Sequence, residues 1–304
     1  MSTIVLSSLH IVLPLLAAPL LPGIINRTKA ILAGRRGQPV LQGYFDLLKL
    51  VRKGAVYSRT TTWLFRAGPI VNLVTIAMGL LLVPFGGSKA LFGFDGDLIL
   101  FAYLLGLGRF FVVAAALDTG SSFEGMGASR EVTFSMLAEP TLFIGLFALS
   151  RLSGSMSLSG ILYSTGVTGW SVGAPVLVSG AFFMIYLSEN ARIPVDDPAT
   201  HLELTMIHEV MVLDHGGPDF ALVSYGAALK LWLLGMLLVG VFSPNLAEAP
   251  LWFREGYALL GMFVLSVGVG VVESLMARVR LLKVPQLLIG AGALSVLAVI
   301  LVLE

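Results

Sequence analysis

Cysteine is absent from this sequence of 304 residues. Disulfide bonds are therefore excluded, and so is an iron–sulfur cluster held by thiolates of this chain. Charged residues are also scarce, at 12% of the chain, whereas a soluble domain carries about 25%. If electrons move through an assembly that contains this chain, other subunits must carry the usual clusters.

A strong net charge is missing too, because the formal charge is only +1. No global basic field is present to attract nucleic acid. Hydrophobic residues instead make up 57% of the chain, and a transmembrane helix needs about 20 mostly apolar residues. Eight segments qualify: about 3–26, 67–87, 98–117, 131–151, 174–189, 219–243, 256–277 and 285–303.

These runs predict an all-α polytopic membrane protein, with residues 1–304 forming a single integral membrane domain. The first apolar stretch, Ile4 to Ile25, has no basic residue ahead of it and no small-residue cleavage pattern. We therefore interpret it as a retained span and not as a signal peptide. Pro14, Pro19 and Pro22 interrupt this span.

Lysine and arginine are distributed unevenly between the two ends of the expected spans. Nine of the 19 basic residues lie between positions 27 and 66, and the same side receives Arg130, Arg192, Arg278, Arg280 and Lys283. The opposite side has only Lys89, Arg151 and Arg254. Because basic loops stay in the cytoplasm, we expect a multi-pass protein of the cell (inner) membrane with both termini outside.

Two of the expected cytoplasmic loops, 27–66 and 189–219, have patterns typical of local structure. From Tyr44 to Lys53 the apolar and charged residues fall on separate stripes, which predicts a short amphipathic helix in contact with lipid at the interface. In the second loop, Asp197 is a candidate N-cap, Pro198 follows it, and Gly216 ends the run. We expect a helix between them.

Six ionisable residues lie within or at the ends of spans, where a charge facing lipid is costly: Arg109, Glu131, Glu139, Glu189, Lys230 and Glu273. At 1.5 Å per residue, Glu131 and Glu189 lie near the cytoplasmic surface and Glu273 about 6 Å below it. Arg109 and Glu139 both lie about 12 Å down, on consecutive helices, and can pair. Lys230 is deepest, at about 16 Å. This series predicts a proton relay; structural ion pairs that fix helix packing are the alternative.

The 189–219 loop carries seven acidic residues and one arginine, and a solvated acidic loop is the alternative to a functional one. His201, His208 and His215 recur every seven residues. That spacing separates them by about 10 Å along a helix, too far for two ligands of one zinc ion. We therefore expect no metal site and interpret the histidines as pH-sensitive relay groups.

Four stretches in this order resemble a known family: RRGQPVLQGYFDLLKLVRKG, LDTGSSFEGMGASREVTFSMLAEP, ENARIPVDDPATHLEL and ESLMARVRL. They are similar to the respiratory complex I membrane subunit that closes the quinone chamber, known in mitochondria as NADH dehydrogenase subunit 1. The resemblance is greatest to its relatives in membrane-bound nickel–iron hydrogenases of the hydrogenase-4 and formate hydrogenlyase type. Complex I has glutamates where this chain has Ala199 and His201, so the resemblance leaves quinone binding open.

The resemblance implies a peripheral redox arm on the cytoplasmic side, antiporter-like membrane subunits alongside, and no cofactor in this chain. Iron–sulfur clusters and a nickel–iron centre would lie in the partner subunits. The loops 27–66 and 189–219 would contact the arm, and the docking residues would be Arg35, Arg36, Asp46, Lys49, Arg130, Arg192, Arg278 and Arg280.

We predict a non-catalytic, membrane-anchoring subunit that links electron transfer in its partners to ion translocation. The proton path would comprise Glu131, Glu139, Glu189, Glu203, Glu209, Glu273, Arg109, Lys230, Asp196, His201 and His208. One alternative is the quinone-chamber subunit of an NADH:quinone oxidoreductase. Another is a stand-alone secondary transporter, although neither inverted repeats nor a broken midplane helix pair is evident. A passive anchor is the third, and it would tolerate neutral residues at the buried acids.

Overall fold

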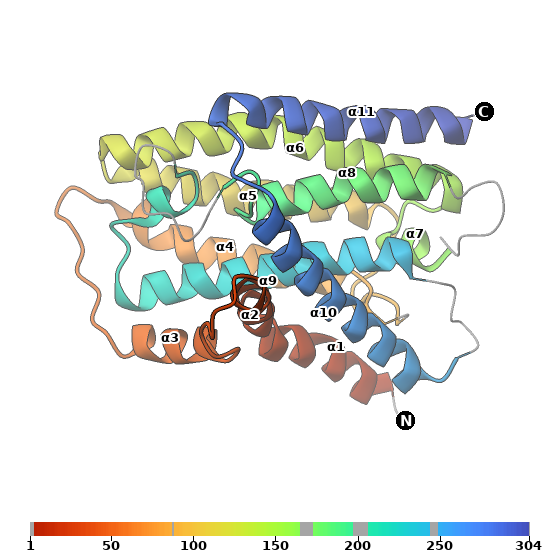
Figure 1. The fold of residues 1–304 in the computed structure, drawn as a ribbon, viewed down its shortest axis with the longest axis horizontal. Coiled ribbons are helices and arrows are strands. Elements are labelled where there is room, and N and C mark those ends of the chain that lie inside the picture. Colours follow the sequence, from red (N-terminus) through yellow and green to blue (C-terminus); the bar gives the residue numbers. More distant parts are fainter. Residues whose placement is uncertain (1–2, 87, 165–172, 197–205, 244–248, 304) are drawn as a thin grey trace.

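The computed structural model describes all residues except 1–2, 87, 165–172, 197–205, 244–248 and 304 (Figure 1). The described part is helical and contains no strand. The α-helices are α1 (Thr3–Ala17), α2 (Leu20–Leu32), α3 (Gln42–Val51), α4 (Trp63–Leu82), α5 (Asp97–Asp118), α6 (Ser122–Ser153), α7 (Leu158–Ser164), α8 (Gly173–Glu189), α9 (Gly217–Phe242), α10 (Leu251–Leu275) and α11 (Val284–Leu303). Two 3-10 turns, η2 (Glu209–Val212) and η3 (Leu281–Lys283), complete them.

Six of the described helices are long and apolar enough to cross a membrane, namely α4, α5, α6, α9, α10 and the last helix counted from Leu281. The first span is broken, because α1 and α2 meet at a bend of 42° just before Leu20. Pro19 precedes the bend, and its missing N–H removes a helical hydrogen bond there. Helix α8, at 17 residues, is slightly short. The expected all-α polytopic membrane fold is confirmed.

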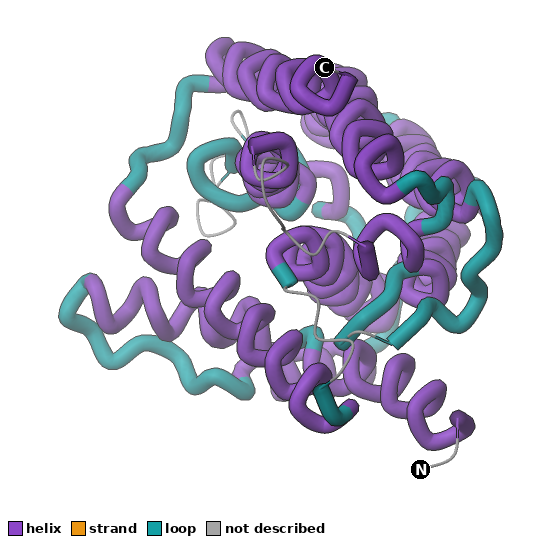
Figure 2. The backbone as a smooth tube through the Cα atoms, turned by 90° about the vertical axis from the view of Figure 1, so that its right-hand side faces the viewer, coloured by secondary structure: helices purple, strands orange, loops and turns teal. Residues whose placement is uncertain are grey.

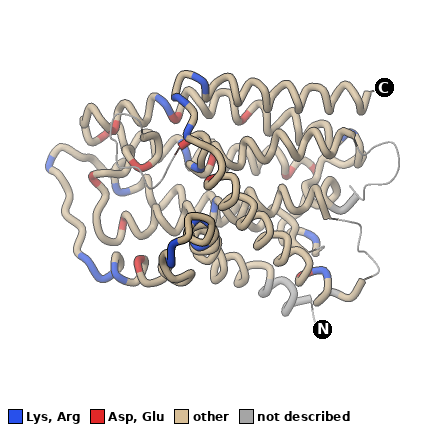
Figure 3. The backbone as a smooth tube through the Cα atoms, viewed as in Figure 1, with Lys and Arg blue, Asp and Glu red and all other residues tan. Residues whose placement is uncertain are grey.

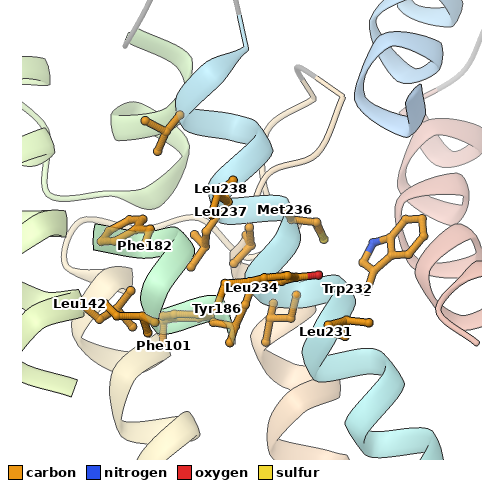
Figure 4. Close-up of a cluster of buried hydrophobic side chains, with 14 of the residues drawn as sticks. Phe101, Leu142, Phe182, Tyr186, Leu231, Trp232, Leu234, Met236, Leu237 and Leu238 are labelled. Carbon is orange, nitrogen blue, oxygen red and sulfur yellow. The ribbon is translucent and has the colours of Figure 1, made fainter. Parts of the chain in front are cut away.

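Helix α9 lies inside the bundle, with neighbours on several sides (Figures 1 and 2). Two thirds of the residues in its most apolar stretch of 18 residues are buried. Its side chains point both toward α8 and away from it (Figure 4). Between membrane helices, close packing replaces the hydrophobic effect as the main attraction. At Gly145 of α6 a Cβ atom would lie 2.5 Å from the ring of Phe182 in α8, so a larger residue there would displace this ring.

Lysine and arginine gather at one end of the bundle, on the left in Figure 3, and we call this the basic end. Helix α1 begins, and α11 ends, at the opposite end (Figure 1). The two ends of the chain thus lie on the same side of the bundle, which agrees with an even number of crossings. Which side faces the cytoplasm remains a prediction from the charge bias.

Helix α3 has the amphipathic pattern expected for 44–53, shifted by two residues toward the N-terminus. It has no buried residue, and the large side chains of Phe45, Leu48 and Val51 are all more than half exposed. Helix α3 contacts α2 and α9 (Figure 1). The apolar side that it leaves uncovered is typical of a helix in contact with lipid or a partner.

The prediction of a helix between Pro198 and Gly216 is wrong for the residues of this stretch that the structure describes. Residues 206–215 form turns and the short η2 instead, while 197–205 lie outside the described residues. Side chains of other segments form hydrogen bonds with backbone groups that a helix would need for its own hydrogen bonds. Asp196 accepts from the N–H of Ile207 at 3.0 Å, and Arg130 donates to the carbonyl of Met206 at 2.8 Å.

Candidate functional site

Arg109 of α5 binds three carboxylates from two other helices at once. Its Nε lies 3.1 Å from Glu131, its Nη1 contacts Glu139, and its Nη2 lies 2.7 and 2.5 Å from the two oxygens of Glu189. Glu131 and Glu139 belong to α6, and Glu189 ends α8. Only a guanidinium has enough donors in fixed positions for three acidic partners. The pairing of Arg109 with Glu139, inferred from their equal depth, is present.

Gly108, next to Arg109, lets α5 approach α4 closely. At Gly108 a Cβ atom would lie 2.5 Å from the hydroxyl of Thr75 in α4, whereas at Gly106 it would lie at an ordinary contact distance of 3.9 Å from Glu139. The GLGR segment therefore serves helix packing. Close packing of α5 on α4 at Gly108 fixes the position of the neighbouring Arg109.

Lys230 and His208 complete the cluster. The ammonium of Lys230 lies 2.7 Å from Glu189, and Nε2 of His208 lies 3.1 Å from the second oxygen of Glu131. Three carboxylates thus face two permanent cations and one titratable ring. One negative charge is left over unless His208 or a carboxyl group holds a proton. We refer to Arg109, Glu131, Glu139, Glu189, His208 and Lys230 as the central cluster.

All members of the central cluster except Glu139 border a chamber of about 270 Å³. Helices α2, α4, α5, α6, α8 and α9 and the segments 190–192 and 208–212 all contribute to its wall. One part of the wall is apolar, with side chains such as Ile76, Leu105 and Phe220. The other part is polar and adds Asn72, Asn190, Arg192, Ser224 and Glu209 to the cluster residues. A chamber of this size with many polar partners can hold several water molecules.

The depth series expected from residue counting is wrong. It placed Glu189 near the surface and Lys230 about 16 Å deep, yet their charged atoms are 2.7 Å apart. Counting assumes that every helix starts at the surface and runs straight across the membrane. Helix α8 ends at Glu189 inside the protein, and the chain that follows it, from Arg192 to Asp196, is also buried. Glu131, Glu139 and Glu189 therefore converge on Arg109.

Glu273 lies apart from the central cluster, in a second group of charges. Its fully buried carboxylate is 2.8 Å from Lys29 of α2 and 3.5 Å from Arg192. Asp196 pairs with Arg278 at 2.8 Å, and the carbonyl of Pro194 accepts from the N–H of Val279 at 2.9 Å. These contacts bind the segment after α8 to the end of α10.

Glu139 has a second environment on the outer surface. Its side chain is 40% exposed and lies in a groove of about 640 Å³ between α5 and α6. The rest of the groove is apolar or aromatic, with Tyr103, Phe110 and Phe143 in its wall. One carboxylate thus connects the buried cluster with a face that lipid or a membrane partner must cover.

The remaining predicted residues are distributed as follows. Arg35, Arg36, Asp46, Lys49 and Arg280 are exposed, whereas Arg192 is buried in the chamber wall. His201 and Glu203 lie outside the described residues. The sequence argument missed Asn72 and Ser224, because it searched the spans for ionisable groups only. The signal for Asn72 is a single amide within the apolar run of α4.

His215 lies three residues after Val212, the last residue of the segment 208–212 in the chamber wall. Its ring stacks on Phe65 at 3.9 Å between centroids. Burial lowers the pKa of His215, while the nearby carboxylates of Asp214 and Asp219 act in the opposite direction. On the neighbouring loop, burial and a hydrogen bond to Asp219 raise the pKa of Tyr57. Both rings are therefore neutral near pH 7. Among the described residues no group of three potential ligands could hold a metal ion.

The comparisons with known proteins agree with this architecture. Residues 4–303 match the family described as NADH dehydrogenase. Formate hydrogenlyase subunit 4 of Escherichia coli (strain K12) is 34% identical over 283 residues, which cover 89% of each chain. Hydrogenase-4 component C of the same organism is 32% identical over 279 residues, covering 90% of this chain and 87% of that protein.

More distant relatives and a solved structure are also similar to this chain. A subunit of the NADH-quinone oxidoreductase of Rubrobacter xylanophilus is 28% identical over 194 residues, 63% of this chain and 57% of that protein. A chain in the solved structure of the archaeal membrane-bound sulfane sulfur reductase has the same fold, with a TM-score of 0.84 and 19% identity over 97% of this chain and 98% of that chain. The chain belongs to the NADH dehydrogenase family and is a membrane subunit of a complex I-like respiratory complex.

Proposed function

We propose that this chain carries protons through the membrane part of a hydrogenase-4 or formate hydrogenlyase type complex, and so links electron transfer in its partners to ion translocation. One observation supports this most strongly. Arg109 binds Glu131, Glu139 and Glu189 together, and Arg109, Glu131 and Glu189 lie in the polar part of the chamber wall. Structural ion pairs need one acid for each cation, whereas this cluster holds an excess of acid.

The excess negative charge makes the central cluster a site for one proton. An uncompensated charge in a buried place costs several kcal/mol, so a proton is bound when the cluster is isolated from water. Because the acids share Arg109, the proton belongs to the group and not to one residue. A change near His208 or Glu131 therefore alters the charge that Glu139 presents about 12 Å away along α6.

The two ends of this arrangement face different partners. At the basic end, the segment 206–215 carries His208, and the loop between α2 and α3 carries the exposed Arg35 and Arg36. We assign this end to the cytoplasm, where a peripheral arm with iron–sulfur clusters and a nickel–iron centre would dock. The groove at Glu139 would be covered by an antiporter-like membrane subunit, since a carboxylate facing lipid is costly.

Replacement of Glu139 with glutamine tests this function. The variant keeps the shape of the side chain and the complex should assemble, but ion translocation driven by electron transfer should be lost. Glu255 provides a matched control, because it is a buried acid at the other end of the bundle, 3.3 Å from Ser88. Glu255→Gln should translocate ions normally. Full translocation by the Glu139 variant would contradict the proposal.

A quinone chamber is the second candidate function, and one observation favours it. The chamber has an apolar wall as well as a polar one, which suits a molecule with a polar head and an apolar tail. Photolabelling of the assembled complex with an azido-quinone distinguishes the two. Labelled peptides from the chamber wall would support quinone binding, and labelling that excess quinone does not suppress would oppose it.

A further inference from the structure

Between α2 and α10 lies a buried ion triad that the proton path described above does not use. Glu273 of α10 stands between Lys29 of α2 and Arg192, which follows α8. The carboxylate is fully buried, the Arg192 side chain is 10% exposed, and the Lys29 side chain is 25% exposed. One member of the triad therefore reaches the surface while another does not.

The buried end of the triad opens into the chamber. Arg192 lines the chamber, and so does Pro22 of α2. Pro22 and Lys29 are seven residues apart, which corresponds to about 10 Å along the helix. The triad thus bridges the short distance between the chamber and the surface, on the side of α2 that packs against α10.

Two buried polar atoms mark the junction between the triad and the chamber. Nε of Arg192 and Oδ1 of Asn190 are buried, and no protein atom in the described part of the chain forms a hydrogen bond with them. Buried polar groups nearly always have a partner, which is an ordered water molecule when the protein supplies none. Both residues belong to the chamber wall, so a water molecule bound to these atoms would lie in the chamber.

We propose that the Lys29–Glu273–Arg192 triad is the entrance through which water and protons reach the chamber from the basic end. This inference rests on the proposed proton path and adds its uptake branch. The ammonium of Lys29 passes a proton to the carboxylate of Glu273 and is reprotonated from the surface. The positive charge of Arg192, which also lies beside Glu273, favours the ionised carboxylate and so promotes release of the proton toward Glu189. A structural ion bridge between α2 and α10 is the alternative that the experiment must separate.

Cysteine labelling tests water access without measuring activity. The chain has no native cysteine, so Glu273→Cys introduces a unique thiol. In the assembled complex, in vesicles that expose the basic end, a small methanethiosulfonate reagent should modify this thiol. Ser266→Cys is the matched control, because Ser266 lies seven residues earlier on α10 and is fully buried. It should stay unmodified. If the thiol introduced by Glu273→Cys is as unreactive as the control, the proposal is overturned.

Glu273→Gln and Lys29→Met test proton uptake in the same vesicles. Both should lower the number of ions moved per electron toward the background of uncoupled vesicles. A variant that loses thermal stability but keeps the normal ratio would show a structural bridge only. Glu189→Gln separates the two proposals. If that variant loses translocation while Glu273→Gln keeps it, the entrance is wrong and the proton path stands; if Glu189→Gln keeps it, the proton path itself is wrong.

Discussion

The guanidinium of Arg109 and the carboxylate of Glu189 form the centre of this protein's charge network. Nη2 of Arg109 lies 2.7 and 2.5 Å from the two oxygens of Glu189, and the side chains are 10% and 9% exposed. One residue ends α8 and the other lies in the second half of α5. Because Lys230 approaches Glu189 from α9, three helices meet at this contact.

Removal of the arginine should prevent assembly. Arg109→Met would leave the buried carboxylates of Glu131 and Glu189 and the half-exposed one of Glu139 with one lysine, and loss of one partner of a buried pair costs about 3–5 kcal/mol. Arg109→Lys should assemble in part, since an ammonium cannot contact three acids in fixed directions. The amount of complex that co-purifies with an affinity tag measures both effects. Equal yields of the methionine variant and the unaltered protein would contradict the assigned role.

Removal of the lysine should have a different result. Lys230→Met leaves Glu189 paired with Arg109, so the complex should form, but the cluster gains a further unbalanced negative charge. We expect it to hold a proton more tightly and to release it more slowly. Turnover of ion translocation should then fall while its initial proton uptake persists, as measured by stopped-flow with a pH dye. A lower yield of complex with unchanged turnover would show that Lys230 acts in folding alone.

Acidification should destabilise the folded segment 206–216 because it favours protonation of His215. Burial holds the pKa of His215 below the ordinary value of 6.5. When the segment is locally unfolded, His215 takes up a proton below that value, whereas in the folded segment it does not. The free energy that keeps the segment folded therefore decreases as the pH falls below 6.5. The change can reach about 1.4 kcal/mol per pH unit. Hydrogen exchange of this segment between about pH 7.5 and 5.5, on either side of the ordinary histidine pKa, measures it, and His215→Gln should remove the dependence. An unchanged slope in that variant would rule out His215 as its source.

Steric change beside Arg109 should disturb the cluster from a distance. Gly108→Val places a branched side chain where even a Cβ atom would lie 2.5 Å from Thr75. Helix α5 would have to move away from α4, which should weaken the contacts of Arg109. Gly268→Val is a suitable control, because nothing lies within 4 Å of a Cβ atom at that position. We expect reduced translocation for the first variant and normal translocation for the second.

The sequence allowed the fold to be predicted well, because each span can be recognised from its length and composition alone. Spans such as α9 and α11 need no information from elsewhere in the chain. The pairing of Arg109 with Glu139 followed from equal depth on neighbouring helices. Such arguments succeed where helices are straight and cross the membrane completely.

The arrangement of the site was less predictable, for two physical reasons. Helix α8 stops at Glu189 inside the protein, so its depth cannot be counted from the surface. The segment around Ile207 takes its structure from Asp196 and Arg130, which lie outside the helical pattern that its apolar residues suggested. Contacts of this kind depend on tertiary packing, and no local period in the sequence reports them.

Ion translocation per electron in reconstituted vesicles tests the central claim most directly. The assembled complex carrying Glu189→Gln should transfer electrons at a normal rate but move almost no ions, because the glutamine cannot share a proton with the other acids around Arg109. The same measurement on Glu255→Gln should give the normal ratio. A normal ratio for Glu189→Gln, with the variant subunit present in full amount, would contradict the role of the cluster as a proton path.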